Sequence, residues 1–184
     1  ALLLGVNGNA ATVDAALEGL RDAELIEDVL RTQAMPGAAE GDEAYRFTHS
    51  IVQEVVYQNL LLRRRTELHG NAGRSLEALC EGRAKRLEDL EALARHFTLG
   101  DDKASGIDYL IEAGDWARRA FANDDAVKHY RRALETIEEC EGLEDRRLGL
   151  LESLADMLGP LGERDEALQH YESVLGDYAE ADDL

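Results

Sequence analysis

The sequence predicts a mainly helical protein in which a small β-hairpin is followed by antiparallel helical hairpins. From residue 50 onward, apolar residues recur only at helical spacing. Before that point, two short extended stretches flank a loop. The 184 residues contain two prolines, Pro36 and Pro160, so long helices are not interrupted. A hydrophobic content of 45% is sufficient for a folded core.

The first 50 residues predict a helix, a strand, a long loop and a second strand. Asn9 or Thr12 can cap the first helix, whose apolar face is Val13, Leu17 and Leu20. Alternating residues then indicate an extended segment, and Pro and Gly indicate a loop. The segments are a helix over 10–20, an extended segment over 25–33, a loop over 35–42 and a returning strand over 44–48.

A helix begins at about residue 50, directly after His49. Ser50 and Gln53 have the spacing of a capping box, in which each side chain bonds the backbone N–H of the other. The helix that follows has an apolar face of Ile51, Val52, Val55, Val56 and Leu60. His49 is therefore expected just before a helix N-terminus, where free N–H groups and the positive end of the dipole favour a phosphate.

Six further helices are predicted after this one, and short connections make neighbours antiparallel. Asn123 is expected to cap the fourth of these helices. Their apolar faces are Leu68, Ala72, Leu76 and Leu79; Leu87, Leu90, Ala94 and Phe97; Ile107, Leu110, Ile111, Gly114, Ala117 and Phe121; Ala126, Tyr130, Ala133, Leu134 and Ile137; Leu148, Leu151, Leu154, Ala155 and Leu158; and Ala167, Leu168, Tyr171, Val174 and Leu175.

Two of the predicted hairpins repeat the same pattern. Small residues allow two helix backbones to approach, and Tyr130 is expected to fill the gap beside them. The small residues of the first copy are Gly114, Ala126 and Ala133, and the second copy has Ala155, Ala167 and Tyr171. The pattern resembles the tetratricopeptide (TPR) repeat, although 41 residues separate Ala126 from Ala167 and the usual period is about 34. The resemblance implies a right-handed solenoid of helical hairpins.

The order of motifs resembles the region after the ATPase core of bacterial STAND signalling proteins, which often carry a nucleotide cyclase, a kinase or a LuxR-type domain. The matching segments are Phe47-Thr48-His49, the arginines at 63–65, Leu68-His69, residues 93–97 and residues 126–135. The resemblance implies the distal part of a winged helix over 1–65 and TPR-like repeats over 66–184. It also implies that His49 touches the phosphate of ADP bound by an upstream core, with ATP or ADP as the parent protein's ligand. The alternative is that His49 caps or packs beneath the wing.

The net charge of −19 is distributed unevenly along the chain. Residues 1–86 carry 10 basic and 13 acidic residues, whereas residues 87–184 carry 10 and 26. This charge disfavours nucleic acid and anionic lipid, and favours a basic partner or simple solubility. No apolar run reaches the roughly 18 residues that a membrane span needs. Cys80 and Cys140 have no metal-binding spacing, which favours reduced, partly buried thiols in the cytoplasm.

The sequence therefore predicts a non-catalytic regulatory segment of a larger signalling ATPase, which binds a protein, a peptide or another domain of the same polypeptide. It contains no phosphate-binding glycine loop and no recognisable catalytic motif, and no metal site is expected. The alternatives are a stand-alone TPR adaptor and a winged-helix DNA-binding regulator. Arg63, Arg64 and Arg65 could contact nucleic acid or form ion pairs at a helix–helix turn. Trp116 could pack between helices or line a groove.

Overall fold

The computed structural model describes residues 10–29, 45–80, 86–143 and 146–182. Eight helices hold 80% of these described residues, and one antiparallel pair of strands precedes the helical hairpins. The predicted fold class is thus confirmed. The chain forms two compact units, an N-terminal unit (residues 1–85 and 99–101) and a C-terminal unit (residues 86–98 and 102–184). The domain boundary predicted between residues 65 and 66 stays a prediction.

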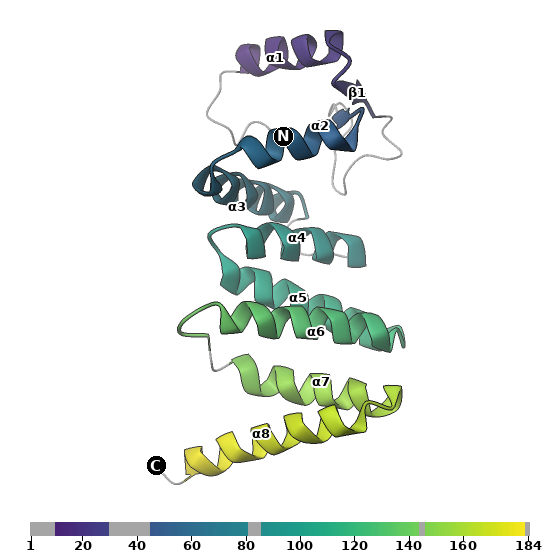
Figure 1. Cartoon of the computed structure of the whole chain (residues 1–184), viewed down its shortest axis with the longest axis vertical. Coiled ribbons are helices and arrows are strands. Elements are labelled where there is room, and N and C mark those ends of the chain that lie inside the picture. Colours follow the sequence, from purple (N-terminus) through teal and green to yellow (C-terminus); the bar gives the residue numbers. More distant parts are fainter. Residues whose placement is uncertain (1–9, 30–44, 81–85, 144–145, 183–184) are drawn as a thin grey trace. The chain divides into compact units, whose positions relative to one another are not determined.

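The described part of the N-terminal unit contains three helices and one pair of strands (Figure 1). The two strands pair antiparallel, with Glu27 opposite Arg46. The Arg46 Nε donates to Glu27 Oε1 at 2.8 Å, which is a favourable cross-strand pair of opposite charges. The predicted loop over 35–42 lies outside the described residues. The elements are α1 (Ala10–Asp22), β1 (Ile26–Asp28), β2 (Tyr45–Phe47), α2 (Ser50–Asn59) and α3 (Leu62–Leu79).

The start of α2 differs from the predicted capping box. His49 is the N-cap residue, with an extended backbone (φ −132°, ψ 128°), and no side chain caps the helix. Its carbonyl oxygen accepts from the N–H groups of Val52 and Gln53 at 3.1 and 3.4 Å. Ser50 is already the first helical residue. The capping box of Ser50 with Gln53 was wrong because the extended residue that begins the helix falls one position earlier.

The C-terminal unit consists of five helices, and each of the last four packs against the next (Figure 1). Its core is one cluster of apolar side chains contributed by all five. Among these, Tyr130, Ile107 and Leu158 have no exposed surface. The helices are α4 (Leu87–Leu99), α5 (Lys103–Arg119), α6 (Asn123–Glu138), α7 (Arg147–Leu161) and α8 (Arg164–Asp182).

Helices α5 and α6 approach each other closely at Gly114. A Cβ atom built on this glycine would lie 2.4 Å from Cε1 and 2.6 Å from Cδ1 of Tyr130. No real Cβ sits at such distances, so the Tyr130 ring occupies the space that any other residue at 114 would need. The neighbouring small residues Ala113, Ala126 and Ala133 are also fully buried. The contact between α5 and α6 therefore depends on the absence of a side chain at residue 114.

The turns inside the two hairpins use the same geometry, 41 residues apart. Phe121 and Gly162 both have positive φ (59° and 88°). Ala122 donates its N–H to the Ala117 carbonyl at 2.9 Å, and Glu163 donates to the Leu158 carbonyl at 3.1 Å. This is the Schellman arrangement that ends a helix with one left-handed residue. The repeat seen in the sequence thus extends to the backbone hydrogen bonds.

Two predictions at the first of these turns were wrong. Phe121 does not extend the apolar face of α5, because it adopts the left-handed turn conformation and is 89% exposed. Asn123 does not cap α6, since Ala122 is the N-cap residue and no side chain makes a capping bond. Both errors have one cause: the Schellman turn ends α5 at Arg119 and leaves three residues before α6.

Replacing Gly114 with alanine tests the close approach of α5 and α6. Gly114→Ala should lower the free energy of unfolding by about 1–3 kcal/mol, because the added Cβ must displace the Tyr130 ring. Urea denaturation measures the change. The control is Gly149→Ala in α7, where the added Cβ would have no neighbour within 4 Å. That change should be neutral or stabilising by up to about 1 kcal/mol. Equal effects of the two substitutions would contradict the close approach.

Candidate functional site

His49, the predicted nucleotide-sensing residue, lies at the N-terminal end of α2 with its imidazole exposed. The hydroxyl of the preceding Thr48 donates to the Glu24 carbonyl at 2.7 Å. The Thr48 backbone N–H also donates to the Leu25 carbonyl at 3.1 Å. These bonds fix the residue before His49 to the end of the α1–β1 connection. The imidazole does not cap the helix, so the capping alternative for His49 has no bond to support it.

The apolar face predicted for α2 is present as a helix face but is not buried. Ile51 is 62% exposed, Val55 53% and Val56 49%. None of the α2 residues is classed with the core. Three neighbouring branched side chains on one short helix make an exposed apolar surface next to His49. Such surfaces in folded proteins commonly contact another protein or domain.

The junction of α2 and α3 is held by a cluster of Tyr57, Arg65 and His69. The Arg65 guanidinium donates to the carbonyls of Leu60 and Gln58 at 3.0 and 2.8 Å, where the last carbonyls of α2 lack helical partners. It also lies over the Tyr57 ring, 4.8 Å from the centroid. The Tyr57 hydroxyl and His69 Nε2 are 3.0 Å apart. Tyr57 and His69 therefore have structural partners within the unit.

The other two arginines of the basic turn pair with one glutamate. Arg63 Nε lies 3.2 Å from Glu67 Oε1, and Arg64 Nη1 lies 3.1 Å from Glu67 Oε2. Their hydrogen bonds, that from Arg64 foremost, lower the pKa of the Glu67 carboxyl. Arg63 and Arg64 thus form ion pairs at a helix–helix turn, which was one of the two alternatives predicted for them.

A tyrosine–aspartate hydrogen bond joins the two helices of each repeat. The Tyr130 hydroxyl donates to Asp115 Oδ1 at 2.7 Å, and the Tyr171 hydroxyl donates to Asp156 Oδ1 at 2.5 Å. Both bonds connect the first helix of a hairpin to the second, and equivalent residues are 41 positions apart. Asp115 and Asp156 were not among the residues predicted from the sequence. The sequence does contain a signal for these aspartates, because in both repeats the aspartate precedes the tyrosine by 15 residues.

The two copies differ in how deeply the tyrosine is buried. Tyr130 has no exposed surface, whereas Tyr171 is 37% exposed. Gly114 leaves room for the Tyr130 ring, but the equivalent residue in the second copy, Ala155, carries a Cβ. The equivalents of Ala126 and Ala133 are Ala167 and Val174, and both are buried. The second repeat thus has the same hydrogen bond with a less enclosed ring.

The first helices of the hairpins, α5 and α7, present acidic side chains to solvent. Glu112 and Asp108 are exposed on α5, and Glu152 and Asp156 are exposed on α7. Some of these charges are paired within the unit, as Asp108 is with Arg146. Trp116 of α5 is 39% exposed, so its indole reaches the surface and is not enclosed between helices. An exposed indole can contact a cationic side chain of a partner through its π face.

Neither the comparisons with known proteins nor the metal-binding and membrane-spanning features of the described residues identify a function. Over the part of the chain that the structure describes, no group of His, Cys, Asp and Glu is placed to hold a metal ion. In the same residues, no helix is long and apolar enough to cross a bilayer. Cys80 and Cys140 are both partly buried. The sequence matches no protein-family model and no curated protein. The fold and the surfaces above are therefore the basis for function.

The buried Tyr130 hydroxyl should make stability depend on alkaline pH. Burial and then the hydrogen bond to Asp115 raise the pKa of this hydroxyl well above its usual 10.0. Because the folded pKa is raised, the stabilisation is complete below pH 10 and decreases as pH rises above it. The free energy of unfolding should fall more steeply above pH 10 in the wild type than in Tyr130→Phe. Tyr178→Phe, at a half-exposed tyrosine, serves as the control. The same alkaline slope in wild type and Tyr130→Phe would contradict the assignment.

Proposed function

We propose that this chain is a non-catalytic regulatory segment whose helical hairpins bind a protein or peptide. The observation that carries the proposal is the repeat of α5–α6 in α7–α8. The spacing of small residues, the Tyr–Asp hydrogen bond and the turn geometry all recur after 41 residues. Repeated hairpins of this kind stack into extended binding surfaces, and their second helices mainly build the array. The hairpins are, in this proposal, TPR-like.

The face that binds the partner is formed by α5 and α7 in this proposal. Acidic side chains exposed on both helices suit a basic or amphipathic peptide, or a basic region of another domain of the same polypeptide. Trp116 would supply an aromatic contact on the same helix as Glu112. Nucleic acid is disfavoured by the same charges, because the phosphate backbone requires a basic surface.

We further propose that the N-terminal unit senses nucleotide in a larger, cytoplasmic bacterial signalling ATPase of the STAND type. Two features support this: the exposed imidazole of His49 at a helix N-terminus, and the exposed apolar face of α2 beside it. An ATPase core packed on that face would bring its bound ADP to His49. Partner binding would then release ADP, provided that the partner binds the two states with different affinities. The chain itself would catalyse no reaction.

Two other functions fit parts of the molecule. A stand-alone TPR-like adaptor would use the same α5–α7 face without any nucleotide. A winged-helix DNA-binding regulator would need a basic recognition helix, but α1 carries only Arg21 as a base against three acids. Arg21 moreover lies 3.9 Å from Asp28. The charge of α1 therefore favours the adaptor as the second candidate.

The sensor role of His49 can be tested in the parent protein that carries the ATPase core. His49→Ala should shorten the residence time of ADP and raise basal signalling, because one phosphate contact is lost. Release of a fluorescent ADP analogue measures the first effect. Gln53→Ala, at an exposed residue one turn along α2, is the control and should release ADP as the wild type does. Unchanged ADP release in His49→Ala would contradict the sensor role.

The charge of the α5–α7 face gives a second test on the chain alone. Helical peptides of equal length and different net charge are presented to the chain, and association rates are measured at low and physiological salt. Basic peptides should associate fastest, and their rate should fall by roughly tenfold as the Debye length shortens. The double variant Glu112→Lys/Glu152→Lys should abolish this preference, and Glu138→Lys on α6 should retain it. Association that is independent of salt and of peptide charge would contradict the proposed face.

A further inference from the structure

The outer face of α8 carries a stripe of exposed apolar side chains. Leu168 is 58% exposed, Leu175 68% and Tyr178 50%, and the partly exposed Tyr171 lies between them. Their spacing of three and four residues places all four on one side of the helix. We call Leu168, Tyr171, Leu175 and Tyr178 the α8 stripe. Exposure of large apolar residues in a continuous row indicates a surface that another element covers.

The chain's own repeat shows what kind of element covers such a stripe. The equivalent residues on α6, 41 positions earlier, are Val127, Tyr130, Leu134 and Ile137. Val127 and Ile137 are 3% exposed, and both belong to the core cluster that contains Leu150, Leu154 and Leu158 of α7. Leu134 packs against the same cluster. The corresponding row on α6 is thus buried in the same core as the leucines of α7.

The rest of α8 retains the burial pattern of α6. Ala167 and Val174 are only 5% and 4% exposed. Their equivalents on α6, Ala126 and Ala133, are likewise buried. These residues belong to the side on which α7 packs within the hairpin. The largest differences in burial between α6 and α8 therefore lie on the α8 stripe. Apart from Tyr171, whose hydroxyl bonds Asp156 of α7, the stripe is on the side where a next helix would lie.

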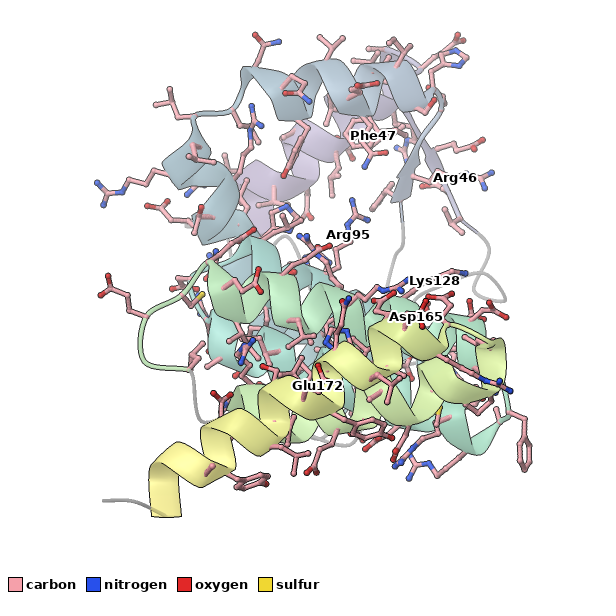
Figure 2. The ribbon with its side chains drawn as sticks, turned by 60° about the horizontal axis from the view of Figure 1, so that its bottom comes forward. Arg46, Phe47, Arg95, Lys128, Asp165 and Glu172 are labelled. Atoms are coloured by element: carbon pink, nitrogen blue, oxygen red, sulfur yellow. The ribbon has the colours of Figure 1, made fainter. Side chains whose placement is uncertain are left out.

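The charges beside the stripe indicate the chemistry of that helix. Asp165 and Glu172 are exposed on α8 (Figure 2, yellow helix). Glu172 is the equivalent of Arg131 on α6, whose guanidinium bonds Glu163 and Glu166 at 2.9 Å. The charge at this position is thus reversed in the second repeat. Arg131 pairs with glutamates of the hairpin α7–α8. A helix that covers the stripe would instead need basic residues to pair with Glu172.

We propose that the α8 stripe is the docking surface for an amphipathic helix with an α7-like leucine face and basic edges. A second copy of the chain fits less well, because pairing two α8 stripes would bring Asp165 and Glu172 of both copies together. This surface is separate from the α5–α7 face of the proposed function. The inference does not depend on nucleotide binding.

The test uses the complete chain and a fluorescent synthetic peptide with the sequence of residues 146–162, which contains α7. In this basic-edged peptide, Glu152 and Asp156 are replaced by lysine. It should bind the chain, and Leu168→Ser/Leu175→Ser in α8 should weaken binding by at least tenfold. Phe121→Gly removes an apolar side chain that is 89% exposed but outside the stripe, and should leave binding unchanged. Circular dichroism verifies that the double variant is folded.

Three results would overturn the proposal. The first is equal binding of the peptide to the wild type and the double variant, which would place the peptide elsewhere, for example in exchange with the chain's own α7. The second is equal binding of the unmodified peptide, in which Arg146 and Arg147 balance Glu152 and Asp156, because this would remove the need for basic edges. The third is a dimer in analytical ultracentrifugation that Leu168→Ser/Leu175→Ser dissociates, because a second copy would then be the occupant.

Discussion

The contact between Tyr130 and Gly114 is the constraint on which the C-terminal unit depends. The Tyr130 ring lies where a Cβ at residue 114 would be. The Tyr130 hydroxyl donates to Asp115, which follows Gly114 on α5. Packing density in protein cores leaves no room to accommodate both a ring and an added methyl group. The contact therefore sets how closely α5 and α6 approach. Val127 and Ile137 of α6 belong to the same core cluster as the leucines of α7.

The helical architecture could be predicted from the sequence, because the apolar residues of each buried helix face recur every three or four positions. The described helices and strands overlap the predicted segments, although β1 ends at Asp28 and residues 30–33 of the predicted extended segment lie outside the described residues. Helix ends could not be predicted so well. Phe121 and Ser50 show why. Local hydrogen bonds and single residues in the left-handed conformation decide where a helix begins or ends, and the spacing of apolar residues does not indicate either.

The candidate sites were only partly visible in the sequence. The histidine before α2 could be singled out from its position, and small residues beside Tyr130 pointed to a close approach of helices. Asp115 and Asp156 were missed because an aspartate on a helix surface has no distinctive pattern until its tyrosine partner is known. The α8 stripe was missed for a different reason. Its residues have the same spacing as a buried face, and only the structure shows that Leu168 and Leu175 are exposed.

A double-mutant cycle between residues 114 and 130 tests the central claim most directly. The free energy of unfolding is measured for the wild type, Gly114→Ala, Tyr130→Val and the double variant. If the ring and the missing Cβ occupy the same space, Gly114→Ala should be destabilising with tyrosine present and neutral or stabilising with valine present. The coupling between neighbours of this kind is typically about 0.5–3 kcal/mol. The same loss of stability in both backgrounds would mean that Tyr130 does not set the approach of α5 and α6, and would contradict the account.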